Sequence, residues 1–147
     1  SSQGELEYVS LSRKSSFAQG ACPATAQVWR GESLKNILNY ATVCAQSGQF
    51  EKLEPLGQYL AQNHYQLAWG PYYLSLVAES RKQYQRALWM LDLAMKREPE
   101  NALLYYQKGR IHWALGEFTP AVKYFQAAID KNSKFVDAHL FLGQTFY

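Results

Sequence analysis

Apolar residues recur along the second half of the chain with the spacing of an amphipathic helix. Within residues 119–131, four of them lie at i, i+4, i+7 and i+8 and share one predicted helix face: Ala121, Phe125, Ala128 and Ile129. The same four positions are apolar 34 residues earlier: Ala87, Leu91, Ala94 and Met95. This pattern predicts two helices of the same design, each with one apolar stripe.

The 34-residue spacing extends beyond these helices. Three sets of residues align at this interval: Gly48, Lys82 and Gly116; Phe50, Tyr84 and Phe118; and Leu53, Ala87 and Ala121. The periodicity runs from about Leu34 to the C-terminus, and a fixed period of this length is typical of repeated helix pairs. We therefore expect two helices in each full unit and one more at the end, seven in all.

Turn-forming and capping residues predict where these helices begin and end. In the third unit, Asn101 is the expected N-cap of the first helix and Gly116 marks its end. Thr119 is the expected N-cap of the second helix, with Pro120 at its first position. In the first unit, Pro55 is expected in the first turn of a helix, where a missing N–H is tolerated.

These residues resemble the tetratricopeptide repeat, whose pattern is W-x2-L-G-x2-Y, then A-x3-F, an A and a P. The third unit matches it at Tyr105, Gly109, Ala121, Phe125 and Ala128, and the second at Leu74, Ser75, Ala87, Ala94 and Pro99. Lys108 departs from the pattern, which has leucine there. The resemblance implies an all-α fold, a right-handed α-solenoid of stacked helix-turn-helix repeats.

The resemblance also divides the chain. Residues 1–33 would be an irregular extension that packs on the first repeat. Residues 34–67 would be a divergent first repeat, 68–101 the second and 102–135 the third. Residues 136–147 would be the first helix of a partial fourth repeat.

Composition and charge narrow the class of protein. The 147 residues are 48% hydrophobic and 18% charged, which is typical of a folded chain. The net charge of +3 comes from scattered lysines and arginines, so we expect no nucleic-acid binding; RNA binding by a helical repeat is the weaker alternative. No apolar run approaches the ~18 residues of a membrane span. Because the chain lacks an initial Met, we expect a trimmed form or a fragment.

No residue pattern indicates catalysis or cofactor binding. The three histidines, His64, His112 and His139, have no ligand partner at helical spacing, so no metal site is expected. A glycine-rich phosphate loop and a G-x-S-x-G motif are both missing from the sequence. We expect no catalytic residue, no cofactor and no enzymatic activity.

The resemblance implies that the first helix of each pair lines the concave side of the solenoid. On that face we expect the partner-binding residues to be Trp69, Tyr72, Leu76, Tyr106, Arg110, Trp113 and Leu140. Tyr, Trp and Arg are enriched at binding hot spots. The alternative is that several of these side chains pack between neighbouring repeats.

The two cysteines, Cys22 and Cys44, allow one disulfide in an oxidising compartment or two free, buried thiols. Cys44 falls on the first helix of the first repeat, so the extension would have to fold back for a bridge to form. A bridge favours a bacterial periplasm or cell envelope over the cytoplasm, which is the alternative.

Together these features predict a scaffold for protein–protein interaction that binds a partner peptide or helix in a concave aromatic groove. The resemblance implies that this scaffold could belong to a bacterial envelope assembly, such as a pilus, secretion or motility machine. The alternative is a non-catalytic regulatory or substrate-holding segment of a larger enzyme. Leu142 and Phe146 lie on one face of the last predicted helix, so we expect further repeats beyond it or self-association through it.

Overall fold

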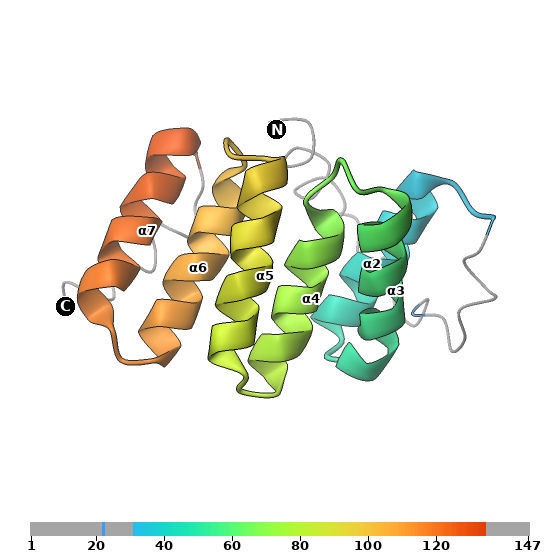
Figure 1. Cartoon of the computed structure of the whole chain (residues 1–147), viewed down its shortest axis with the longest axis horizontal. Coiled ribbons are helices and arrows are strands. Elements are labelled where there is room, and N and C mark those ends of the chain that lie inside the picture. Colours follow the sequence, from blue (N-terminus) through green and yellow to red (C-terminus); the bar gives the residue numbers. More distant parts are fainter. Residues whose placement is uncertain (1–21, 23–30, 135–147) are drawn as a thin grey trace.

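The computed structural model describes residue 22 and residues 31–134 of the chain. These residues form six α-helices and no strand: α2 (Leu34–Gln46), α3 (Phe50–Asn63), α4 (Trp69–Ser80), α5 (Tyr84–Arg97), α6 (Ala102–Ala114) and α7 (Phe118–Lys131). Helices α3 to α7 follow one another in chain order along the long axis of the molecule, and α2 overlaps α3 in this view (Figure 1). The expected all-α solenoid is confirmed.

The turns that follow α2, α4 and α6 share one backbone geometry. The second residue after each helix has a positive φ: 73° at Gly48, 58° at Lys82 and 76° at Gly116. The next residue donates its N–H to the carbonyl five positions earlier, at 2.9 Å in all three turns: Gln49 to Cys44, Gln83 to Ala78 and Glu117 to His112. This is the six-to-one hydrogen bond of a Schellman turn, which ends a helix. The 34-residue alignment of these positions therefore reflects one repeated turn.

Three of the four residues in each predicted apolar stripe are buried, and the fourth, Met95 or Ile129, is half-buried. Ala87, Leu91 and Ala94 are the buried residues of α5. Their counterparts 34 residues later in α7 are equally buried: Ala121, Phe125 and Ala128. An alanine at either end of each stripe lets the neighbouring helix approach closely, and the larger central residue fills the space between the two helices.

Two predictions about helix starts are wrong. α7 begins at Phe118 with Glu117 as its N-cap residue, so Thr119 is not the cap and Pro120 is the third helical residue. The reason is the tight turn at Gly116, which leads the backbone into the helix before Thr119 is reached. Pro55 is the sixth residue of α3, beyond the first turn, so this helix tolerates an internal proline. The Asn101 cap is confirmed, because its Oδ1 accepts from the N–H of Leu103 at 3.1 Å.

Two glycines allow the closest approaches between helices. A Cβ atom on Gly70 would lie 2.3 Å from the backbone nitrogen of Ala61, where α4 meets α3. A Cβ atom on Gly109 would lie 2.5 Å from the ring of Phe125, where α6 meets α7. Neither site has room for a methyl group, so these residues fix the spacing of their helix pairs.

A buried carboxylate joins the loop after α5 to the loop after α3. Glu98 is only 4% exposed, and its Oε2 accepts from the N–H of Ala68 at 2.6 Å. The neighbouring Arg97 donates from NH1 to the carbonyl of Leu67 at 3.2 Å. Ala68 is the N-cap residue of α4, so the carboxylate lies at the positive end of that helix dipole. No local pattern predicts this link, because it joins residues 30 apart in the sequence.

Several predictions lie outside the described residues. These are most of the extension 1–33, the seventh helix and partial repeat at 136–147, and the partner-binding role of Leu140. Self-association through the last helix also stays a prediction.

Three glycine-to-alanine variants test the packing argument. We expect Gly70→Ala to lower the free energy of unfolding by about 3 kcal/mol, because the new methyl group meets backbone, and Gly109→Ala by about 1–2 kcal/mol, because a ring must move. Gly57→Ala is the matched control. Its Cβ would lie 3.0 Å from the flexible Leu74 side chain, and alanine favours a helix by about 1 kcal/mol, so little change is expected. Denaturant unfolding measures all three, and equal losses would contradict the argument.

Candidate functional site

A cavity of about 310 Å³ lies among α2, α4 and α6. Its walls come from the end of α2, the start of α3, four side chains along α4 and one side chain of α6: Ala45, Gln46, Phe50, Tyr72, Leu76, Glu79, Ser80 and Arg110. We call this surface the α2/α4/α6 face. Its lining combines apolar and polar side chains, which is the usual make-up of a site that anchors and orients a ligand group.

The polar side is a closed network of three side chains. Arg110 donates from NH2 to Oε2 of Glu79 at 3.2 Å and from NH1 to Oε1 of Gln107 at 2.9 Å. Gln107 donates in turn to Oε1 of Glu79 at 2.9 Å. The network links α4 to α6, and its positive and negative charges offset each other. A partner's acidic group would therefore compete with Glu79 for Arg110.

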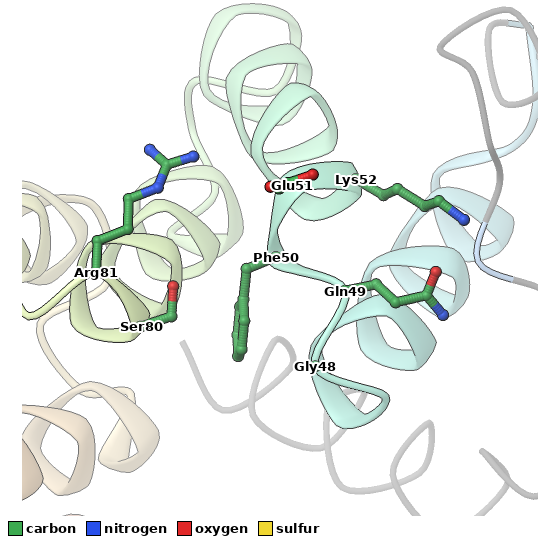
Figure 2. A pocket seen from close by; sticks show the side chains of 7 residues that line it. All are labelled: Gly48, Gln49, Phe50, Glu51, Lys52, Ser80 and Arg81. Carbon is green, nitrogen blue, oxygen red and sulfur yellow. The ribbon is translucent and has the colours of Figure 1, made fainter.

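A second cavity, of about 570 Å³, adjoins the first at the turn between α2 and α3. Phe50 and Ser80 line both cavities. Figure 2 shows the Phe50 ring extending from the start of α3 into the space between Ser80 and Gly48. The charged side chains of Glu51, Lys52 and Arg81 lie around it. The aromatic ring of Phe50 therefore forms part of the lining of both cavities.

The predicted partner-binding residues fall into two groups. Trp69 and Tyr72 are only 2% and 3% exposed, and their rings pack edge to face with centroids 5.8 Å apart. Both belong to the core, although Tyr72 also borders the cavity. The other four described residues, Leu76, Tyr106, Arg110 and Trp113, are half-buried.

Arg110, which lines the cavity, shares a face of α6 with two aromatic side chains. The Arg110 guanidinium lies 6.0 Å from the centroid of the Tyr106 ring. Trp113 packs edge to face against Phe118 at 4.8 Å, and Phe118 is 51% exposed. Tyr106, Arg110 and Trp113 follow one another at intervals of four and three residues, so they share a helix face. We call Tyr106, Trp113 and Phe118 the aromatic patch.

Four cavity residues were not predicted from the sequence: Ala45, Gln46, Phe50 and Ser80. Only Phe50 carried a signal, as one of the aromatic residues repeated at 34-residue intervals. The other three are small or polar residues near helix ends, and only the arrangement of three helices brings them together.

A cluster of ionisable side chains lies between α5, α6 and α7. Lys108 donates to Asp92 at 2.7 Å, and its Nζ lies 4.8 Å from the centroid of the Tyr124 ring. Burial opposes the charged form of Lys108, but its hydrogen bonds and charge interactions with Asp92 and Tyr124 outweigh that effect, and the pKa of Lys108 is raised. A lysine nucleophile needs a lowered pKa, so this arrangement stabilises the structure instead. In the described residues, no three His, Cys, Asp or Glu side chains are grouped to hold a metal ion.

The disulfide lies beside the cavity. Cys22 and Cys44 are bonded, with Cα atoms 4.9 Å apart, and Cys44 is fully buried on α2. The pair is therefore bridged and not two free thiols. Ala45 and Gln46, the two residues that follow Cys44, line the cavity.

Comparison with known proteins agrees with this architecture. The model of the family described as "Tetratricopeptide repeat" matches residues 65–133 and 106–147, which together span more than half of the chain. The chain belongs to the tetratricopeptide repeat family. This fold is consistent with a scaffold for protein–protein interaction and suggests protein partners.

Individual tetratricopeptide relatives are distant. The chain is 27% identical over 123 residues to tetratricopeptide repeat protein 37 of Xenopus laevis, a match that covers 79% of this chain and 8% of that protein. Its fold is similar to the crystal structure of MamA, with a TM-score of 0.65 at 17% identity over 82% of this chain and 71% of the MamA chain. Among the described helices, none is both long enough and apolar enough to span a membrane.

The disulfide can be tested by unfolding with and without the bridge. We expect Cys22→Ser to lower the free energy of unfolding by about 3 kcal/mol, because the bridge closes a loop between residues 22 apart in sequence. Mass spectrometry of protein purified without reductant should find no thiol that can be alkylated. Two alkylated thiols, or an unchanged unfolding curve in the variant, would contradict the assignment.

Proposed function

We propose that this tetratricopeptide chain is a scaffold that holds a peptide or helix of a partner protein against the α2/α4/α6 face. The cavity among three helices carries the proposal, because it offers a recess for an anchoring side chain. Two members of the aromatic patch, Tyr106 and Trp113, share the face of α6 that carries the cavity residue Arg110. Tyr and Trp provide large contact areas at little cost in conformational entropy, since each has only two side-chain torsions.

The chemistry of the cavity favours an uncharged anchor. Glu79 and Arg110 already satisfy each other's charge, and the lining also includes the apolar or aromatic side chains of Ala45, Phe50, Tyr72 and Leu76. A charged group entering the cavity would lose water without gaining an unpaired counter-ion. An apolar or aromatic side chain, with its backbone close to Ser80 and Gln46, suits this site better.

The setting we propose is an assembly in a bacterial envelope. Its support is the Cys22–Cys44 disulfide, because such bonds persist in oxidising compartments and are rare in the cytosol. The alternative, a non-catalytic segment of a larger enzyme, requires a longer polypeptide. The sequence of the full-length gene decides between them.

A matched pair of tryptophans tests the binding surface. Trp113 is half-buried on α6, three residues after the cavity residue Arg110, whereas Trp89 is 63% exposed on α5, outside the α2/α4/α6 face. A partner captured from native extract would first be purified and its Kd measured by calorimetry. Trp113→Ala and Tyr106→Ala should each weaken binding at least about fivefold, the hot-spot threshold of about 1 kcal/mol. Trp89→Ala should leave the Kd unchanged.

Unfolding curves of the same variants separate lost contacts from lost structure. Arg110→Ala should weaken binding as strongly only if the partner presents an acidic group that displaces Glu79. Wild-type affinity in folded Trp113→Ala and Tyr106→Ala proteins would contradict the proposed surface.

A further inference from the structure

The first and third repeats share one turn geometry, so residues two repeats apart occupy equivalent places. Gly48 and Gly116 have φ angles of 73° and 76°. The residue after each glycine closes the same six-to-one hydrogen bond at 2.9 Å. The next residue begins the second helix of its pair, Phe50 in α3 and Phe118 in α7. The surroundings of these two aromatic rings can therefore be compared position by position.

The two rings differ in what the preceding helix places beside them. Trp113 lies five residues before Phe118, and the two rings pack edge to face with centroids 4.8 Å apart and planes at 71°. The equivalent residue, five before Phe50, is Ala45. A methyl group cannot cover the Phe50 ring as the Trp113 indole covers that of Phe118. The first repeat thus lacks the indole that the third repeat carries.

The cavity of about 310 Å³ lies at this place in the first repeat. Ala45 and Phe50 both line it, and Leu76 adds a further apolar contact. Figure 2 shows the Phe50 ring extending into the space between Ser80 and Gly48. A cavity of about 150 Å³ already accommodates benzene, so this one has room for an aromatic ring system.

The polar groups of the lining favour an indole over other aromatic rings. The Ser80 hydroxyl donates to the carbonyl of Val77 at 2.6 Å, so its lone pairs are left to accept. The carboxylate of Glu79 only accepts, and each of its oxygens can take a second hydrogen bond besides those from Arg110 and Gln107. Because Glu79 and Arg110 are already paired, a neutral donor is the complementary group, and the indole N–H is donor only.

We infer that the cavity on the α2/α4/α6 face takes a tryptophan side chain of the partner protein. This indole packs on Phe50 as Trp113 packs on Phe118, and its N–H donates to Ser80 or Glu79. The partner thus supplies in the first repeat the ring that the chain itself supplies in the third. The inference rests on the proposed function, since it concerns the same cavity, and it names the residue that the partner presents.

Small probes test this inference in the full-length, oxidised chain without any partner. The isotope-labelled protein is titrated with N-acetyl-tryptophanamide and, separately, with N-acetyl-leucinamide, and binding is followed by two-dimensional NMR. We expect saturable shifts at the backbone amides of Ala45, Gln46, Phe50 and Ser80. The Kd of the tryptophan probe should be about fivefold lower than that of the leucine probe, because an aromatic pair adds to the burial of apolar area.

Three variants show whether the probe occupies the place of the missing indole. Phe50→Leu should weaken the tryptophan probe about fivefold and leave the leucine probe unchanged, because only the aromatic pair is lost. Ala45→Trp places an indole beside Phe50 and should abolish binding of the tryptophan probe. Gln58→Trp, on an exposed position of α3 outside the cavity, is the matched control and should bind as the wild type does. Circular dichroism checks that each variant is folded, and Phe50→Leu decides the question if Ala45→Trp does not fold.

The outcomes that would overturn the inference are distinct from those for the proposed function. Absence of saturable shifts at the cavity amides would overturn it, as would equal Kd values for the two probes. Unchanged binding of the tryptophan probe in folded Ala45→Trp or Phe50→Leu would do the same. The proposed function is judged separately by the Kd of the partner protein in the Trp113 and Trp89 variants, in which no probe is used.

Discussion

The close contact between neighbouring helices at Gly70 and Gly109 is the constraint from which the rest of the structure follows. At Gly70 the backbone of α3 occupies the position where a side chain would be, and at Gly109 the ring of Phe125 does so. The alanines on α5 and α7 allow similar approaches at full burial. Beside this helix spacing, the turns after α2, α4 and α6 share one Schellman hydrogen-bond pattern, so each first helix ends in the same way.

The candidate site depends on how closely the neighbouring helices pack. Residues from α2, α4 and α6 meet around one cavity because alternate helices recur on the same side of the stack. Arg110 reaches Glu79 across two such helices and fixes the polar wall. The disulfide adds a covalent restraint at the first of them, next to the residues that close the cavity. The helix packing, the Arg110–Glu79 network and the disulfide are therefore all found at or beside this cavity.

Much of the fold could be predicted from the sequence because its signals are local. The apolar stripe of α7 and the Asn101 cap each depend on residues within a few positions of one another. The 34-residue alignment even placed Lys82 with two glycines, and all three adopt a positive φ. Thr119 was wrongly predicted as the N-cap of α7, because the turn at Gly116 starts the helix before Thr119 is reached. The residue types alone do not show which of these two signals sets the start of the helix.

The site could be predicted only in part, for a different reason. Trp69 and Tyr72 have the side chains of a binding hot spot, but large aromatic residues also fill cores, and their burial is decided by helices distant in sequence. The pairing of Arg110 with Glu79 joins residues 31 apart and leaves no local signature. Gln46 and Ser80 became site residues only when three helices were placed together.

Hydrogen–deuterium exchange in the presence of a bound partner tests the central claim most directly, because it reports protection helix by helix. If the α2/α4/α6 face holds the partner, peptides from the end of α2, the second half of α4 and α6 should exchange more slowly in the complex. Peptides from the middle of α3, α5 and α7 should be unchanged. Protection confined to α3, α5 and α7 would contradict the account.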